Sequence, residues 1–156
     1  PIIPPLVNKW IQEPDSFRME IFNDTIQAIP AIHYDTWQLL STRLRIVSAG
    51  IRIGEIKGKD ILPAHSLALS TALNKDAFTC AEVSWDDAIK YLKKEALLLP
   101  TEIEKGYVLV CYQGFPLGFV KHLGNRANNL YPQEWRIRTG YIPEQVLLLI
   151  DYQQKR

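Results

Sequence analysis

Alternating apolar and polar residues predict strands in the first half of the chain. Residues 17–22 alternate well enough to form one strand, and the turn signal Asn23-Asp24 leads into residues 25–29 as its antiparallel partner. Two further β-rich runs, 45–48 and 51–56, follow later. The pattern therefore predicts a small sheet that begins with a hairpin.

Two helices are expected among these strands. Asp35 can cap the first one, which would run to about Thr42. Its apolar residues recur at helical spacing and would share one face: Trp37, Leu40 and Leu44. Pro63 is well placed as the first residue of the second helix, where a backbone N–H is not needed.

The second half of the chain shows the same mixture with a clearer pattern. Residues 78–83 form a predicted strand, and Ser84 is the expected N-cap of a helix whose buried stripe would be Trp85, Ala88, Ile89 and Leu92. Residues 106–112 are the clearest strand of all, and residues 117–121 return after a turn. This half is predicted to form a small, strongly curved sheet or barrel with one helix.

These elements divide the chain into parts. We expect residues 1–16 to be a linker from an upstream domain, because the proline-rich start has no initiator Met and resembles a piece cut from a longer polypeptide. Residues 17–75 would form a small α+β subdomain and residues 76–140 a second one, since Asn74-Lys75-Asp76 interrupts the pattern. Residues 141–156 would be a C-terminal extension.

Composition narrows the class of protein. Of 156 residues, 47% are hydrophobic and 22% charged, which is typical of a folded protein. The sequence contains no apolar run long enough for a membrane span and no signal peptide, so we expect a cytoplasmic protein that does not bind membranes. The net charge of +1 does not by itself indicate a nucleic-acid partner. Cys80 and Cys111 lie in strand-like segments and are expected to be buried, reduced thiols.

A complete active site is not recognisable in the sequence. Gly58-Lys59 lacks the upstream glycine and the Ser or Thr of a phosphate-binding loop, and the sequence has no dinucleotide-binding glycine motif. The three histidines have no metal-ligand spacing with one another or with the cysteines. We therefore predict no catalytic residue, no metal site and no cofactor in this chain.

One stretch, Gly114–Arg138, has the composition of a binding surface. It combines cations suited to phosphates, asparagines suited to base edges or the 2′-hydroxyl, and aromatic rings suited to stacking on unpaired bases, including Phe119. The same aromatic and asparagine residues would also serve a core and its turns. A third reading is a protein-docking groove with Pro116, Phe119 and Trp135 as contacts.

The stretch also resembles a known family. A series of residues, in order, is similar to the C-terminal signature of the bacterial Sun-family RNA (cytosine-5) methyltransferases of the rRNA small subunit methyltransferase F type: Gly114-Phe-Pro-Leu-Gly118, Lys121, Gly124, Asn129, Tyr131-Pro132 and Arg136. The similarity extends over about residues 17–138. It departs from the family at Asn128, where Lys is common, at Trp135, where an aliphatic residue is usual, and from Thr139 onward.

The resemblance implies an accessory, non-catalytic role. In this family S-adenosylmethionine and the catalytic cysteines belong to a separate upstream domain. A PUA-like domain, a mixed β-barrel with a short helix, holds structured RNA, which the resemblance implies is ribosomal. It implies an RNA-binding set here: Lys121, Arg126, Asn128, Asn129, Tyr131, Trp135 and Arg136. The expected partners are therefore RNA and a methyltransferase domain in cis.

Overall fold

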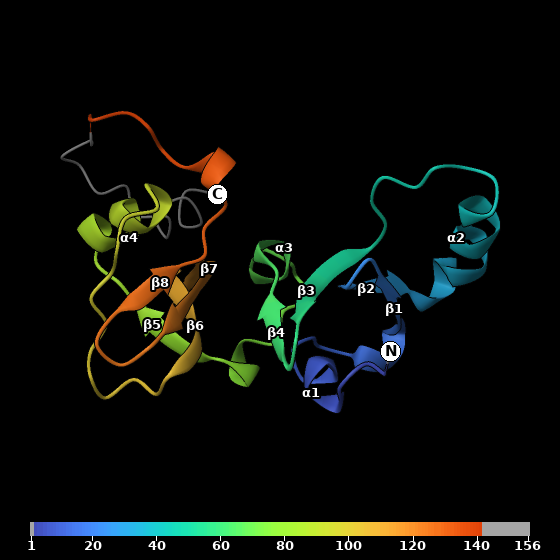
Figure 1. The fold of residues 1–156 in the computed structure, drawn as a ribbon, viewed down its shortest axis with the longest axis horizontal. Coiled ribbons are helices and arrows are strands. Elements are labelled where there is room, and N and C mark those ends of the chain that lie inside the picture. Colours follow the sequence, from blue (N-terminus) through green and yellow to red (C-terminus); the bar gives the residue numbers. More distant parts are fainter. Residues whose placement is uncertain (1, 142–156) are drawn as a thin grey trace, which may run out of the picture. The chain divides into compact units, whose positions relative to one another are not determined.

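Two separate four-stranded sheets organise residues 2–141, the part of the chain that the computed structural model describes (Figure 1). The chain divides into unit 1, Pro1–Phe78, and unit 2, Thr79–Arg156, with one sheet in each. The predicted α+β class with two subdomains is confirmed. The division lies at Phe78 and Thr79 rather than at residues 75 and 76. Of the expected extension 141–156, residues 142–156 lie outside the described residues.

Unit 1 contains an antiparallel sheet whose strands are neighbours in sequence order: β1 (Phe17–Phe22), β2 (Thr25–Pro30), β3 (Ile51–Lys57) and β4 (Asp60–Pro63). Asn23 and Asp24 both have positive φ, at 46° and 61°, as the twist of a two-residue hairpin turn requires. The helices are α1 (Pro5–Asn8), α2 (Tyr34–Ser41) and α3 (His65–Ala68), with 3₁₀ turns at Pro14–Ser16, Ala31–His33 and Lys75–Ala77.

The segment expected to be a linker is instead packed into unit 1. Val7, Trp10 and Ile11 are buried, at 0%, 4% and 2% exposure. Trp10 stacks on Phe78 with ring centroids 5.3 Å apart, and Ile11 forms a β-bridge with Leu73. The prolines of this segment led to the prediction of a linker, but its three buried apolar side chains form part of the core of unit 1.

Three further expectations about unit 1 are wrong. Residues 45–48 form a loop and not a strand. Pro63 ends β4, where it pairs with Gly54, so the helix begins two residues later with Ala64 as its N-cap. The N-cap of α2 is His33, and Asp35 lies within the first turn.

Unit 2 has a mixed sheet: β5 (Thr79–Glu82), β6 (Gly106–Tyr112), β7 (Phe115–His122) and β8 (Ala127–Asn129). β5 pairs with β6 in parallel, and α4 (Trp85–Leu92) connects them; the other pairs are antiparallel. Ser84 caps α4 as predicted, since its hydroxyl accepts from the Asp87 amide at 3.2 Å. A 3₁₀ turn at Gln133–Trp135 follows β8. The sequence analysis predicted neither of these two elements.

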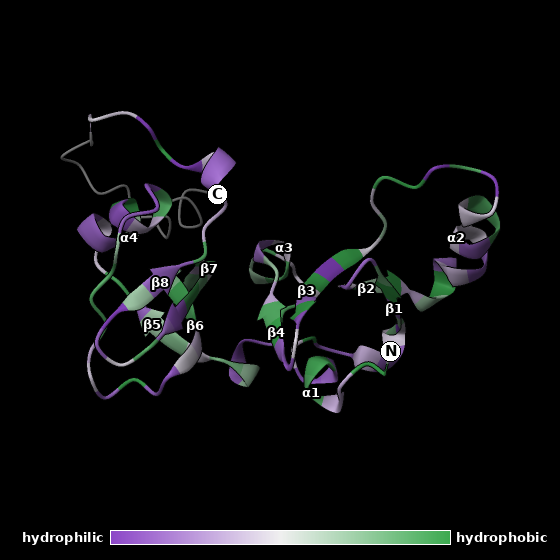
Figure 2. Ribbon diagram, in the orientation of Figure 1, coloured by the Kyte–Doolittle hydropathy of each residue, from purple (hydrophilic) through white to green (hydrophobic). Residues whose placement is uncertain are grey.

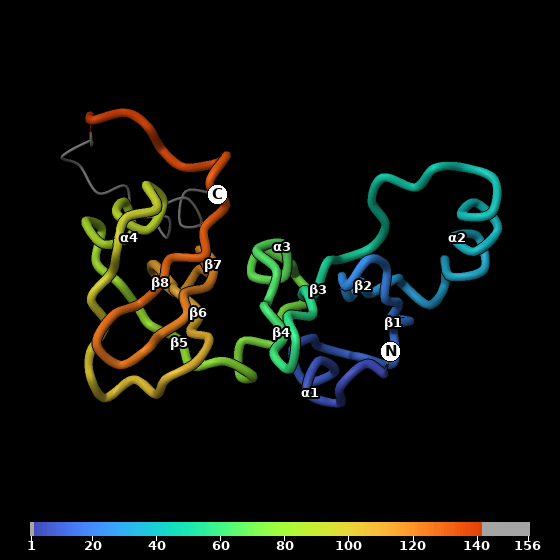
Figure 3. Tube along the Cα trace, in the orientation of Figure 1, coloured from blue at the N-terminus to red at the C-terminus, as the bar shows by residue number. Residues whose placement is uncertain are grey.

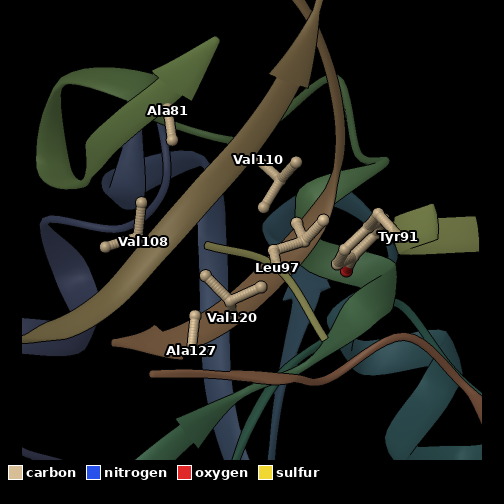
Figure 4. Close-up of a cluster of buried hydrophobic side chains, with 7 residues drawn as sticks. All are labelled: Ala81, Tyr91, Leu97, Val108, Val110, Val120 and Ala127. Carbon is tan, nitrogen blue, oxygen red and sulfur yellow. The ribbon is translucent and has the colours of Figure 1, made fainter. Parts of the chain in front are cut away.

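A cluster of buried apolar residues lies on one face of the sheet of unit 2. It gathers one face of the sheet, Tyr91 from α4 and Leu97 from the segment after the helix (Figure 4). Its buried members are Ala81, Tyr91, Leu97, Val108, Val110, Val120 and Ala127. Tyr91, which the predicted helical stripe omitted, is completely buried, and its hydroxyl donates to the Phe119 carbonyl at 3.0 Å.

The Pro116-Leu-Gly118 motif is a β-bulge. Val110 pairs with Gly118 and Cys111 pairs with Pro116, which leaves Leu117 without a partner across the ladder. Gly118 has φ of 150°, which L residues rarely adopt. The bulge lets Leu117 pack against the core cluster, so this motif shapes the sheet.

Candidate nucleic-acid interface

The predicted RNA-binding residues separate into two groups on unit 2. Lys121 lies on β7 directly between Tyr107 of β6 and Asn128 of β8 in the strand register. Directly opposed residues point to the same side of a sheet, and their neighbours Val108, Val120 and Ala127 belong to the core on the other side. Tyr107, Lys121 and Asn128 therefore form one cross-strand row.

This row offers a cation beside an aromatic ring. Lys121 Nζ lies 5.0 Å from the centroid of the Tyr107 ring and 3.5 Å from its hydroxyl oxygen. Asn128 is exposed at the end of the row. Sequence reasoning missed Tyr107 because it belongs to a strongly apolar strand whose other residues fill the core.

A tight turn adds further charge at the end of the row. The Leu123 amide donates to the Arg126 carbonyl at 2.8 Å, and the Arg126 side chain is exposed. Gly124, with φ of 98°, lies under Lys105, since a Cβ at this glycine would come within 2.8 Å of Lys105 Cε. We call Lys105, Tyr107, Lys121, Arg126 and Asn128 the β-rim cluster. Lys105 was also missed, since it stands far from the basic stretch in sequence.

The second group lies at the C-terminal end of α4. Asn129 Nδ2 donates to the carbonyls of Tyr91 and Glu95, both at 2.9 Å, and its Oδ1 accepts from the Tyr131 amide at 2.9 Å. Tyr91 belongs to the last turn of α4, whose carbonyls lack intrahelical partners, and Glu95 follows the end of the helix. The side chain therefore links β8 to α4. Asn129 was expected to contact RNA; this stays a prediction, and in the structure its amide is used within the fold.

Tyr131 and Trp135 differ in how far they are available. Tyr131 is partly buried and meets Tyr91 edge to face, with ring centroids 5.5 Å apart, so it packs on the core. Trp135 is 57% exposed. Phe119 is only 1% exposed, which removes it both as a stacking platform and as a docking contact.

Arg136 lies in a shallow basic recess beside the helix end. The recess is lined by Lys93, Glu95, Arg136, Ile137, Arg138, Thr139 and Gly140. The Ile137 amide donates to the Leu92 carbonyl at 2.9 Å, which fixes this segment to α4. Three of its lining residues are cationic, so the recess suits an anionic group.

The described part of the chain shows neither a metal-ligand group nor a membrane-spanning helix. No group of three or more His, Cys, Asp or Glu residues there could hold a metal ion, and no helix there could span a membrane. Cys111 is buried, as expected, but Cys80 is exposed, because β5 is an edge strand. Burial raises the pKa of Tyr91 and lowers that of His65.

Comparison with known proteins identifies this unit. Residues 78–137 match the family described as the methyltransferase RsmF PUA domain. This region belongs to that family. The match begins within one residue of the structural division and covers every strand of unit 2, so the PUA domain coincides with a unit that has its own core.

The chain is also similar to longer proteins named ribosomal RNA small subunit methyltransferase F. It is 32% identical to one from Shewanella sp. (strain W3-18-1) over 69% of this chain and 21% of the relative. It is 30% identical to one from Enterobacter sp. (strain 638) over 59% and 18%, and 27% identical to one from Klebsiella pneumoniae (strain 342) over 59% and 19%. The chain spans about a fifth of the length of these curated relatives, and the predicted resemblance is confirmed.

Proposed function

We propose that this chain is the RNA-binding accessory region of an S-adenosylmethionine-dependent rRNA (cytosine-5) methyltransferase. It would hold structured RNA for a catalytic domain in cis and would not itself be catalytic. The single observation that carries the proposal is the β-rim cluster, in which the row of Tyr107, Lys121 and Asn128 adjoins the turn that carries Arg126 and is contacted by Lys105. The relatives, named as ribosomal RNA methyltransferases, supply the class of RNA.

The β-rim cluster matches what a folded RNA presents. Lys105, Lys121 and Arg126 are suited to phosphates, because charge-assisted hydrogen bonds are the strong ones and phosphate contacts position a protein on its nucleic acid. Asn128 can both donate to and accept from a base edge or a 2′-hydroxyl. A lysine in place of Asn128 would offer charge and donors but no acceptor, so asparagine gives up a phosphate-binding charge and adds an acceptor.

The helix-end residues would make a second, weaker contribution. Arg136 and Arg138 would contact phosphates, and the exposed Trp135 offers a ring for stacking. Asn129 and Tyr131 would support these residues from within the fold, since both are held against α4. The revised contact set is therefore Lys105, Tyr107, Lys121, Arg126, Asn128, Trp135, Arg136 and Arg138.

A salt titration tests this function. We would measure fluorescence anisotropy of a labelled rRNA hairpin with the chain. The five cations of the contact set, at about −0.7 per phosphate, give a log–log slope of about −3.5, so affinity should fall roughly a hundredfold between about 50 and about 200 mM salt. Arg126→Glu should weaken binding and flatten this slope, and Arg136→Glu should do so less. Lys90→Glu is the matched control, because it reverses a charge on the outer face of α4, where Lys90 pairs with Asp87 at 2.9 Å.

Two outcomes would refute the function. Binding that ignores both salt and Arg126→Glu would contradict an RNA surface at the β-rim cluster and favour a docking role for Pro116 and Trp135. Binding of S-adenosylmethionine by this chain alone, measured calorimetrically, would contradict the non-catalytic assignment, since we expect that cofactor in the catalytic domain. The cytoplasmic location remains a prediction.

A further inference from the structure

The helix α2 has an apolar face that no described part of unit 1 covers. None of its eight residues is buried. Leu39, Leu40 and Leu44 are 60%, 41% and 59% exposed. Figure 2 shows the apolar positions along this helix, and Figure 3 shows the chain running out to it from β2 and back to β3. A helix of eight residues gains little stability on its own. Amphipathic helices are normally stabilised by burying their apolar face against another part of the protein.

A cavity of about 260 Å³ lies beside this helix, and Leu44 is the one of these three leucines that lines it. It lies between α2, the loop that follows it and the β1–β2 hairpin, and we call it the α2 groove. Its apolar walls are Phe22, Trp37, Leu44, Ile46, Val47 and Ala49. The volume is below the roughly 300–1,000 Å³ of small-molecule sites, so it suits a protruding side chain better than a free metabolite.

The walls of the groove have features of an incomplete interface. Phe22 is 65% exposed and Val47 is 94% exposed, so both side chains leave apolar surface in contact with solvent. Trp37 Nε1 is buried and has no hydrogen-bond partner among the described residues. A buried donor without an acceptor is uncommon in a protein structure.

The charges at the groove define the partner's chemistry. Leu44 lies between the exposed Arg43 and Arg45, and Arg45 lines the cavity. The lining contains no acidic residue. A matching surface would carry an apolar side chain for the cavity and carboxylates beside it. RNA fits poorly, because the walls are predominantly aliphatic and aromatic.

We propose that the α2 groove docks the methyltransferase portion that the relatives carry outside the fifth of their length matched by this chain. This inference rests on the proposed function, which assigns such a catalytic domain as the partner. Four fifths of each relative lies beyond the match, which is ample chain to supply the cover. Docking through unit 1 uses none of the residues of the β-rim cluster, which all belong to unit 2.

Binding to a separately expressed methyltransferase portion tests the docking. The probe is the Shewanella sp. (strain W3-18-1) relative without the fifth that matches this chain. Calorimetry should show binding to the unmodified chain and at least a tenfold loss with Leu44→Glu. The matched control is Leu69→Glu, since Leu69 is 56% exposed in the same unit but does not line the groove. Arg45→Glu should also weaken binding, because it replaces the complementary charge.

The outcomes separate this inference from the proposed function. Leu44→Glu should bind the rRNA hairpin as tightly as the unmodified chain, so loss of docking with intact RNA affinity concerns the groove alone. Equal binding by Leu44→Glu and Leu69→Glu, or no binding by the unmodified chain, would overturn the docking site. Self-association of the unmodified chain that Leu44→Glu abolishes, seen by sedimentation, would assign the groove to a second copy and overturn the proposal as well.

Discussion

Asn128 and Asn129 are adjacent in β8, and their side chains point to opposite sides of the sheet. Asn128 pairs across the ladder with Lys121, whereas Asn129 pairs with Val120 of the core. The same residue type should therefore respond to alanine in two different ways. Asn129→Ala should destabilise unit 2 with little direct effect on RNA, and Asn128→Ala should lower RNA affinity without changing stability.

The magnitude follows from the hydrogen bonds of Asn129. Its side chain makes three, to Tyr91 O, Glu95 O and Tyr131 N. At about 1 kcal/mol each, their loss amounts to about 3 kcal/mol. Water can replace the bond to the exposed Glu95, and the Tyr91 carbonyl keeps its bond from the Lys94 amide at 2.9 Å. We therefore expect a loss of about 2 kcal/mol.

Hydrogen exchange of the β6 amides measures this loss within unit 2. A decrease of about 2 kcal/mol in the free energy of opening corresponds to exchange roughly thirtyfold faster in β6. Asn128→Ala, the matched control, should leave these rates unchanged and weaken binding in the RNA titration. If Asn129→Ala left β6 exchange unaltered while reducing RNA affinity, the assignment of this amide to the fold would be wrong.

Three other substitutions test the structure. Gly50→Ala should destabilise unit 1 by about 2 kcal/mol or more, because φ is +60° and the new Cβ would lie 2.1 Å from the Ala28 carbonyl oxygen; an unchanged thermal midpoint would contradict this. Tyr91→Phe should cost only about 1 kcal/mol in urea denaturation, since the Phe119 carbonyl also accepts from the Leu130 amide at 3.2 Å; a cost near 3 kcal/mol would mean that this second bond does not compensate. Burial lowers the pKa of His65, so the unfolded chain binds a proton more readily than the folded chain, and stability should fall as pH drops below about 6.5. His65→Gln should remove that part of the pH dependence. Identical plots of stability against pH for the variant and the unmodified chain would refute this.

Regular patterns in the sequence predicted much of the fold. The β1–β2 hairpin, β6 and the Ser84 cap are specified locally, by alternation, a turn signal and one side chain. β4 and β8 were missed because each is short and follows a turn, so that pairing with a longer neighbour defines it. Residues 45–48 are β-rich, but no strand is available to pair with them in the described structure, and the loop ends in the left-handed Gly50.

The site was harder to predict than the fold. RNA binding by Lys121, Arg126 and Asn128 stays a prediction. Strand register places Tyr107 beside Lys121, and Lys105 lies over Gly124, two neighbours that the sequence pattern did not indicate. Residue type alone does not show whether an asparagine faces solvent or a helix end. The alternation of a strand decides this, and β8 was not recognised as a strand.

The parallel pairing of β5 also bears on the order in which unit 2 assembles. β6 and β7 are joined by a two-residue turn at Gln113-Gly114, so this hairpin can close within microseconds of its synthesis. β5 precedes it in the chain, yet its only partner in the described sheet is β6, beyond the helical crossover. The first strand of the unit to leave the ribosome therefore has no partner strand until β6 has emerged. A chain terminated before Gly106 would release β5 with its edge unpaired and Cys80 open to oxidation, a substrate for quality-control proteases rather than a partial domain.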